Sequence, residues 1–523
     1  MQMELDSVLK QNFNLPGFRP GQKEIISSII NKKDVLAVLP TGGGKSLCFQ
    51  FPAVFTKELV IVVSPLIALM KDQVRSLQNN NIPAGAIYSG QTENEKRQIF
   101  SDIQKGGPYV LYLSPERVQK EGFQQWIRAR KIALFAIDEA HCVSQWGHDF
   151  REEYSQLNIL KRLRPDVPTL ALTASATPTV LHDIAKQIHL KNPEKRVHGF
   201  YRPNLYFQVE MCDGEDMKNQ LLVKGIEQHP TGRVIVYCGT RKKTEEVHQE
   251  LSERFSGVGY YHAGLTPNRR TEVQEQYMNG DLRILVATNA FGMGIDQSDV
   301  RLVVHYHMPA TIDALYQEMG RAGRDGQDST CLMLYASKDK GLQSYFIQSS
   351  DAPQEIKSAR WRNLDALVNY SESSECRHAE ILTYYQDAQR IQQCGHCDNC
   401  LPLSDRKIVL PKVTLADRLL PDRIKNGATK SSGGKSSVKK RSSGDAIILN
   451  DLQETKFQAL KVWRKQKAVE LDVPAFIIFS DRTLRELALH NPSNFDDLQS
   501  IHGIGSDKLE RYGADVMLVL REG

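Results

Sequence analysis

The stretch Asp138-Glu139-Ala140-His141 follows directly on the apolar run Ala133-Leu134-Phe135-Ala136-Ile137. A second signature, Thr41-Gly42-Gly43-Gly44-Lys45-Ser46, follows the apolar run 35–40 in the same way. Short continuous apolar runs are typical of buried strands in parallel sheets. A glycine loop after one strand and paired carboxylates after another are the groups that hold a magnesium nucleotide and cleave its last phosphate. Their order in the chain favours an ATPase.

Apolar runs alternate with helix-like stretches from Val35 to Tyr335, which is typical of an α/β fold with parallel sheets covered by helices on both faces. The predicted strands are 35–39, 59–63, 110–113, 133–137 and 169–172, then 233–237, 258–261, 283–287, 302–305 and 331–335. These two sets predict two similar lobes, 1–200 and 201–335, joined near 199–204.

Bulk properties limit the classes of protein that remain. The chain has 523 residues, 41% of them hydrophobic, and a formal net charge of +5. This mild basic bias permits a nucleic-acid partner without requiring one. We find no uninterrupted apolar run of membrane-spanning length, and the N-terminal residues 1–6 lack the pattern of a secretory signal. We therefore expect an intracellular protein with no membrane partner.

The glycine loop and the acidic pair predict a nucleotide site. Backbone N–H groups of Thr41 and the glycines Gly42, Gly43 and Gly44 would approach phosphate oxygens. Lys45 would reach the β- and γ-phosphates and the Ser46 hydroxyl would hold Mg²⁺. Asp138 would bind Mg²⁺ through water, and Glu139 would orient and deprotonate the attacking water. The alternative for the acidic pair is an ordinary helix N-terminus after a strand.

Two arginines in the second half suit the same reaction. The segment Gln317-Glu318-Met319-Gly320-Arg321-Ala322-Gly323-Arg324 places Arg321 and Arg324 three residues apart. Residues at this spacing share one helix face, and a guanidinium can neutralise charge on a transferring phosphoryl group. The alternative is a solvated basic turn.

Four of the nine cysteines cluster, at Cys376, Cys394, Cys397 and Cys400. Four thiolates complete a closed tetrahedral zinc site of the structural kind. An iron–sulfur cluster uses the same number of cysteines, and free thiols are the third alternative. The pattern around them predicts a helical metal-binding module over 336–402. A basic stretch poor in apolar residues then predicts a flexible linker over 403–450.

The ordered motifs resemble those of the RecQ branch of superfamily-2 DNA helicases, whose two lobes are RecA-like. Besides the motifs above, the matching stretches are 18–22, 64–73, 114–117, 172–177, 261–265 and 287–296. The resemblance implies that Arg19 and Gln22 read adenine and that Gln317 contacts the nucleotide. The family usually has an aromatic residue near Leu15, and this chain departs from it there.

The segment 142–151 combines exposed aromatics with basic residues, which suits stacking on a single strand. It also resembles the aromatic-rich loop of RecQ helicases. We therefore predict DNA contacts by Trp146, His148, Phe150 and Arg151, with a local packing role as the alternative.

The C-terminal residues 451–523 resemble an HRDC domain, through 462–464, 473–481 and the turn Ile501-His502-Gly503-Ile504-Gly505. Whether this domain binds DNA or protein stays open. The usual RecQ layout also includes a winged helix of about 100 residues. Only about fifty residues separate Cys400 from the next folded segment, so a full winged helix does not fit.

The resemblance implies an ATP- and Mg²⁺-dependent DNA helicase moving 3′→5′ on single strands in recombination and repair. Tailed or forked DNA is the expected substrate, and a single-strand DNA-binding protein is an open partner. Location would be the cytoplasm and nucleoid in a bacterium or the nucleus in a eukaryote. The alternatives are a DNA translocase or annealing protein with weak unwinding, and an RNA-remodelling helicase.

Overall fold

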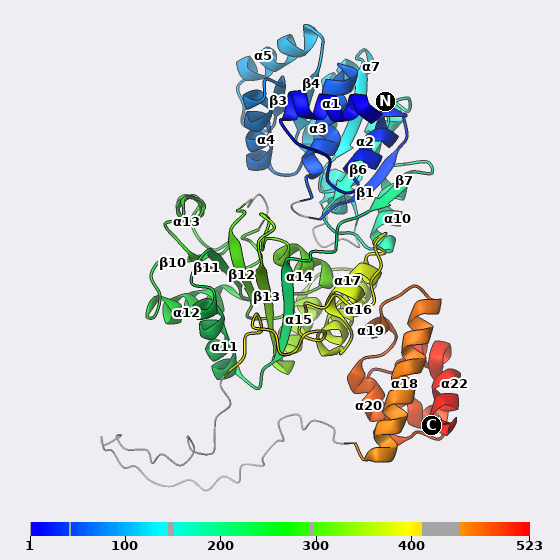
Figure 1. The fold of residues 1–523 in the computed structure, drawn as a ribbon. Helices are drawn as coiled ribbons and strands as arrows, with labels where there is room; N and C mark the ends of the chain where they lie inside the picture. Colours follow the sequence, from blue (N-terminus) through cyan, green and yellow to red (C-terminus); the bar gives the residue numbers. More distant parts are fainter. Residues whose placement is uncertain (1, 41–42, 145–150, 293–296, 411–448, 523) are drawn as a thin grey trace.

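A computed structural model describes residues 2–40, 43–144, 151–292, 297–410 and 449–522. Two parallel sheets lie one after the other along the chain, followed by a helical module and a separate helical domain (Figure 1). This arrangement confirms the α/β class, the two sheet-bearing lobes and the helical C-terminal parts. Within the described ranges we find no helix that combines the length and apolar character that a bilayer crossing requires.

The first lobe holds a parallel sheet whose described strands run in the order β3-β4-β2-β5-β6-β1-β7. The strands are β1 Val35–Val38, β2 Leu59–Val63, β3 Ala84–Ile87, β4 Tyr109–Leu113, β5 Ile132–Ile137, β6 Thr169–Thr173 and β7 Glu194–Val197. The helices are α1 Gln2–Phe13, α2 Gln22–Ile30, α3 Lys45–Thr56, α4 Ile67–Asn79, α5 Glu93–Gln104, α6 Pro115–Val118, α7 Glu121–Arg128, η1 Ala140–Val143, α8 Glu152–Ser155, α9 Asn158–Leu163 and α10 Pro178–Gln187.

The second lobe repeats the design with the order β10-β11-β9-β12-β13-β8. Its strands are β8 Leu205–Met211, β9 Arg233–Tyr237, β10 Val258–Tyr261, β11 Ile284–Ala287, β12 Val300–His305 and β13 Ser329–Tyr335. Its helices are α11 Glu215–Gln228, α12 Arg241–Ser252, α13 Pro267–Asn279 and α14 Ile312–Met319.

All ten apolar runs predicted as strands are strands, and every residue of the central strands β1, β2 and β5 is buried. The sequence prediction missed three strands. β3 reads Ala-Gly-Ala-Ile and β7 reads Glu-Lys-Arg-Val, so neither carries a run of large apolar side chains. β8 mixes polar with apolar residues, and it forms because it pairs with the long strand β13 over its whole length.

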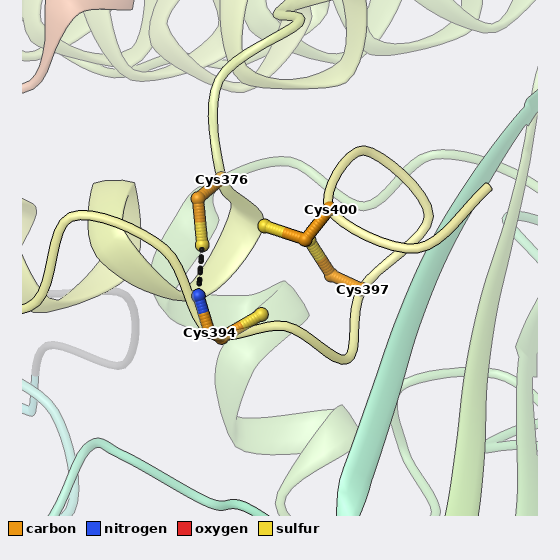
Figure 2. Close-up of side chains that lie close together, drawn as sticks. All are labelled: Cys376, Cys394, Cys397 and Cys400. Carbon is orange, nitrogen blue, oxygen red and sulfur yellow. Dashed lines mark hydrogen bonds between the residues drawn. The ribbon is translucent and has the colours of Figure 1, made fainter.

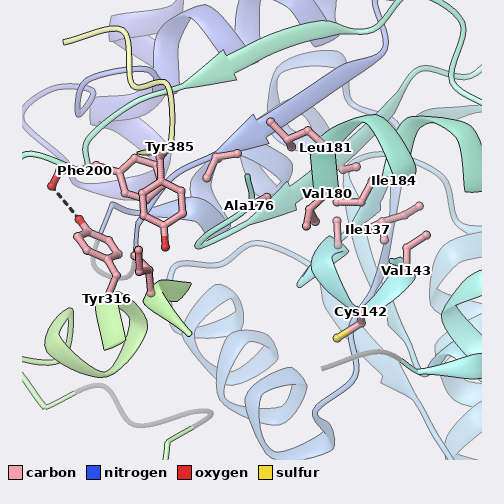
Figure 3. Packing of buried hydrophobic residues seen from close by; sticks show 14 of the residues in the cluster. Ile137, Cys142, Val143, Ala176, Val180, Leu181, Ile184, Phe200, Tyr316 and Tyr385 are labelled. Atoms are coloured by element: carbon pink, nitrogen blue, oxygen red, sulfur yellow. Dashed lines mark hydrogen bonds between the residues drawn. The ribbon is translucent and has the colours of Figure 1, made fainter. Parts of the chain in front are cut away.

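The connection between the lobes is anchored by aromatic packing (Figure 3). Phe200 stacks on Tyr385 with ring centroids 4.1 Å apart, and its carbonyl accepts a hydrogen bond from the Tyr316 hydroxyl at 2.9 Å. Its backbone N–H donates to Asp387 at 2.8 Å. Tyr316 belongs to α14 and Tyr385 follows α17, so one residue of the connection contacts both the second lobe and the helical module.

The helical module comprises α15 Ser337–Ser349, α16 Gln354–Glu372 and α17 Arg377–Tyr384. Beyond it the chain returns to the second lobe, where Ile408 is fully buried and Gln208 Nε2 donates to its carbonyl at 2.7 Å. Arg406 also donates to the carbonyls of Asn204 at 2.8 Å and Ser329 at 2.6 Å. Residues 403–410, which fall inside the predicted linker 403–450, therefore pack on the second lobe. The remainder of that prediction, 411–448, lies outside the described residues.

The last domain consists of α18 Asp451–Glu470, α19 Ala475–Ile478, α20 Asp481–His490, α21 Phe495–Gln499 and α22 Ser506–Glu522. Its own core includes Leu460, Phe479, Leu484 and Val516. Figure 1 shows this domain beside α16 and α17, away from the first lobe.

Candidate active site and metal centre

The glycine loop leads from β1 into α3, as predicted, and Lys45 is the first residue of that helix. Gly44 precedes it with φ at 73°, in the left-handed region that glycine adopts most readily. The Gln22 side chain braces the loop, with Nε2 donating to the Gly43 carbonyl at 3.2 Å and to the Gly44 carbonyl at 2.9 Å. Two of the predicted loop residues, Thr41 and Gly42, lie outside the described residues.

Gly44→Ala should weaken ATP binding at least about tenfold, a change of roughly 1.4 kcal/mol. A Cβ at this position would lie 2.4 Å from Gln22 Nε2, and the left-handed backbone would be strained as well. Titration with a fluorescent ATP analogue measures the effect. Gly122→Ala is the control, because a Cβ there meets no atom within 4 Å. Equal affinity in Gly44→Ala and the parent chain would contradict this account of the loop.

The acidic pair closes β5, next to β2. Asp138 continues the sheet, since its N–H donates to the Val63 carbonyl at 2.9 Å, and its side chain is buried. Burial first, and the neighbouring Glu139 carboxylate second, raise the pKa of Asp138 to about 7, while the Lys45 ammonium opposes the rise. Lys45 and Asp138 therefore share one site, as the sequence predicts. A buried carboxyl beside a half-buried one, with one opposing ammonium, fits a divalent cation.

Glu139 has φ at 48°, a left-handed backbone that is unusual for a residue other than glycine. Such strain costs on the order of 1–3 kcal/mol and gathers at functional sites. Its Oε2 lies 3.3 Å from His141 Nδ1, which is 2.9 Å from the Thr173 hydroxyl at the end of β6. This chain of polar contacts ties the acidic pair to the neighbouring strand, and we did not predict it.

A cavity of about 1020 Å³ separates the lobes. His141 and Ser175 line it from the first lobe, and Gln317 and Arg321 line it from the second. Arg321 is buried and donates to the Gly292 carbonyl. Of the predicted site residues, Gln317 and Arg321 line this cavity, whereas Lys45, Asp138 and Glu139 are not among its lining residues. The first lobe contributes His141, which lies beside Glu139.

Two residues that sequence reasoning missed hold the turn that carries the arginines. Arg202 donates from Nη2 to the carbonyls of Ala322 at 3.0 Å and Gly323 at 2.7 Å. Asn204 donates to the Gly323 carbonyl at 2.9 Å. Both belong to the connection between the lobes, so this connection sets the position of the turn between Arg321 and Arg324.

Three of the four predicted DNA-contact residues, Trp146, His148 and Phe150, lie outside the described residues. The fourth, Arg151, directly precedes α8, and its N–H donates to the Cys142 carbonyl at 3.0 Å. The DNA contacts therefore stay a prediction.

The cysteine cluster forms a compact metal site (Figure 2). The four sulfur atoms of Cys376, Cys394, Cys397 and Cys400 lie within 4.8 Å of one another. Backbone N–H groups point at the sulfurs, with Cys394 N 3.2 Å from Cys376 Sγ and His396 N 3.3 Å from Cys394 Sγ. The four sulfurs thus fit a thiolate-bound metal such as zinc.

Two histidines lie beside this cluster, and His378, Cys394 and His396 also place one possible ligand atom each within 4.8 Å of one another. His378 stacks on Phe207, with ring centroids 4.1 Å apart. Both ring nitrogens of His396 have protein partners, the Leu205 carbonyl at 3.2 Å and the Tyr201 hydroxyl at 3.1 Å. The cysteine set therefore remains the better ligand set.

Cys397→Ser should abolish stoichiometric zinc binding and lower the unfolding midpoint by at least about 5 °C, since each kcal/mol moves the midpoint of a domain by roughly 2–4 °C. Elemental analysis of the purified chain and differential scanning calorimetry measure the two effects. Cys212→Ser, at a buried cysteine of the second lobe, should keep its zinc. Iron in place of zinc, or zinc retained in Cys397→Ser, would contradict the assignment.

Comparisons with known proteins agree with this geometry. The DEAD/DEAH box helicase family matches residues 19–184 and the helicase conserved C-terminal domain matches 217–326. The RecQ zinc-binding family matches 337–401 and the HRDC domain matches 453–520. A solved structure of a Dbp5 variant from S. cerevisiae bound to Gle1 and IP6 superposes with a TM-score of 0.52, at 18% identity, over 69% of this chain and 96% of that one. That likeness concerns the fold alone.

Proteins related by sequence share a higher identity with this chain than that solved structure does. The ATP-dependent DNA helicase RecQ of Bacillus subtilis is 34% identical over 97% of this chain and 96% of its own length. A putative ATP-dependent RNA helicase of Acanthamoeba polyphaga mimivirus is 40% identical over 76% of this chain and 72% of its own length. The near-full-length match, the zinc-binding module and the two facing lobes together show that the chain belongs to the RecQ family of ATP-dependent helicases.

Proposed function

We propose that this protein hydrolyses ATP between its lobes and uses the reaction to move 3′→5′ along single-stranded DNA and separate a duplex. The observation that carries the proposal is the cavity itself, because it sets His141, beside the acidic pair, opposite Gln317 and Arg321 of the second lobe. A nucleotide bound there would contact both lobes, so its hydrolysis would change their separation.

The described residues take distinct roles in this proposal. Lys45 would bind the terminal phosphates, and Ser46 and, through water, Asp138 would hold Mg²⁺, whose charge would stabilise the phosphoryl group in transfer. Glu139 orients the attacking water and takes its proton, and His141 holds Glu139 in place through its contact with Thr173. Arg321 and Arg324 meet the phosphate when the lobes close.

The Gln22 side chain must change its hydrogen bonds before it can contact adenine. Its carbonyl accepts from Arg19 N at 2.7 Å while both amide hydrogens are used by the glycine loop. We therefore propose that Arg19 and Gln22 read adenine once the Gln22 amide leaves the glycine loop. Leu15, which is 39% exposed, stands where the family usually has an aromatic residue.

A strand-separation assay tests the proposed function. A duplex with a 3′ single-stranded tail should be separated in the presence of ATP and Mg²⁺, and a duplex with only a 5′ tail should stay intact. Separation of the 5′-tailed duplex alone would contradict the proposed 3′→5′ direction of movement and indicate movement 5′→3′. ATP hydrolysis without separation of either duplex would make this chain a translocase or annealing protein.

An RNA-remodelling helicase is the second candidate, because the mimivirus relative carries that description. The comparison of ATP hydrolysis rates with single-stranded DNA and with RNA of the same sequence separates the two. We expect stronger stimulation by DNA, through the segment that holds Trp146, His148, Phe150 and Arg151. Recombination and repair inside the cell, with tailed or forked DNA and a single-strand DNA-binding protein as partners, complete the proposed role.

A further inference from the structure

The HRDC domain contacts the zinc-binding module through a buried aromatic side chain. Phe476 is fully buried, yet it packs with the core that includes the zinc module and not with the core of its own domain. Its ring lies 5.9 Å from that of Tyr370 on α16 and 6.3 Å from that of Tyr384 on α17. Asn369 donates to the Phe476 carbonyl at 2.9 Å. The two domains thus share one apolar core at this point.

Polar contacts surround Phe476. Arg464 of α18, which is 1% exposed, binds Asp481 of its own domain at 2.7 Å and lies 3.7 Å from Glu375 of the zinc module. Lys461 donates to the Ser374 hydroxyl at 2.9 Å. At the rim, Arg390 pairs with Asp472 at 3.0 Å. An apolar centre with a charged rim is the anatomy of a specific interface.

The contacted segment leads directly into the candidate metal site. Ser374 and Glu375 immediately precede Cys376, the first of the four clustered cysteines. Asn399, beside Cys400, donates to the carbonyls of Ser373 at 3.0 Å and Glu375 at 2.6 Å. The shape of this segment therefore depends on the cysteine cluster.

The turn 501–505 uses part of its hydrogen-bonding capacity within its own domain. His502 N donates to Glu486 at 3.1 Å, and Ile504 N donates to the Ile501 carbonyl at 3.2 Å. These internal bonds leave fewer N–H groups for a phosphate, which favours protein contact as the role of the domain.

We propose that the HRDC domain is held on the zinc-binding module of its own chain, with Phe476 as the anchor and the metal-held segment 373–376 as part of the docking surface. The domain then moves with the second lobe as one body. In a chain too short for a full winged helix, it braces the helices α16 and α17.

Distance measurements on the full chain test this directly, without ATP or DNA. Spin labels on azide-bearing residues at Lys242 of the second lobe and Val469 of the HRDC domain leave the cysteines untouched; both side chains are exposed. The parent chain should give one narrow distance distribution. Phe476→Asp should broaden it several-fold, because a carboxylate cannot stay buried between two tyrosine rings.

Two further variants make the result decisive. Asn369→Asp, on the zinc-module side, should broaden the distribution in the same way while leaving the HRDC domain unaltered. Leu452→Asp, at a side chain that is 64% exposed, should leave the distance distribution narrow.

Removal of the metal from the parent chain with a chelator should broaden the distance distribution, as the two interface variants do. A broad distribution in the parent chain, or a narrow one in both interface variants, would overturn the docking. A narrow distribution after metal removal would overturn the role of the metal.

Discussion

Glu139→Gln should lower the rate of ATP hydrolysis by at least about 100-fold while ATP still binds, since a positioned general base contributes roughly 10²–10⁴-fold. The amide keeps the shape of the side chain and its place beside His141, but it cannot take a proton from water. Steady-state phosphate release measures the loss, and titration with a fluorescent ATP analogue measures binding.

Glu121→Gln on α7 is the matched control, because that exposed carboxylate belongs to the same lobe and lies outside the acidic pair. It should hydrolyse ATP at the parent rate. A Glu139→Gln chain that turned over near the parent rate would remove Glu139 from the reaction, and lost nucleotide binding would point to a damaged fold.

Arg321→Ala should lower the turnover number by about 10³-fold or more, the effect typical of an arginine that stabilises a transferring phosphoryl group. Arg321 lines the cavity from the second lobe, and in the proposed mechanism its guanidinium meets a phosphate held by the first lobe when the lobes close. Arg324→Ala should show a loss of similar size. Single-turnover measurements of phosphate release separate this chemical step from nucleotide binding.

Arg269→Ala serves as the control, because Arg269 is 47% exposed and pairs with Glu272 on the surface helix α13. Its turnover should be unchanged. If Arg321→Ala and Arg324→Ala both kept the parent turnover number, hydrolysis would not require these arginines of the second lobe. That result would contradict the proposed coupling between ATP hydrolysis and lobe movement.

Sequence patterns predicted the sheets well where burial alone decides the structure. Runs such as Leu59–Val63 are apolar at every position, and they form fully buried central strands. Glu194–Val197 at the sheet edge forms through backbone pairing with β1, a contact that leaves no mark on its own composition. Burial of Ile408 likewise depends on a partner surface about 200 residues earlier in the chain.

In the candidate site, too, residues in local motifs could be predicted and residues placed by distant contacts could not. Lys45, Asp138 and the four cysteines were predicted from local motifs. The structure places the Lys45 ammonium near enough to Asp138 to lower its pKa, and it gathers the four sulfur atoms within 4.8 Å of one another. The bracing of the arginine turn by Arg202 could not be predicted, because backbone carbonyls accept those bonds and carry no sequence signal. The same holds for Phe476, since nothing in a helical pattern says which domain will bury an apolar residue.

The steady-state rate of ATP hydrolysis with and without single-stranded DNA, in the presence of Mg²⁺, tests the central claim most directly. If the cleft between the lobes is a motor site, the purified chain should hydrolyse ATP slowly alone and many times faster with the oligonucleotide. No hydrolysis under either condition, or a rate that DNA leaves unchanged, would contradict a motor driven by this site.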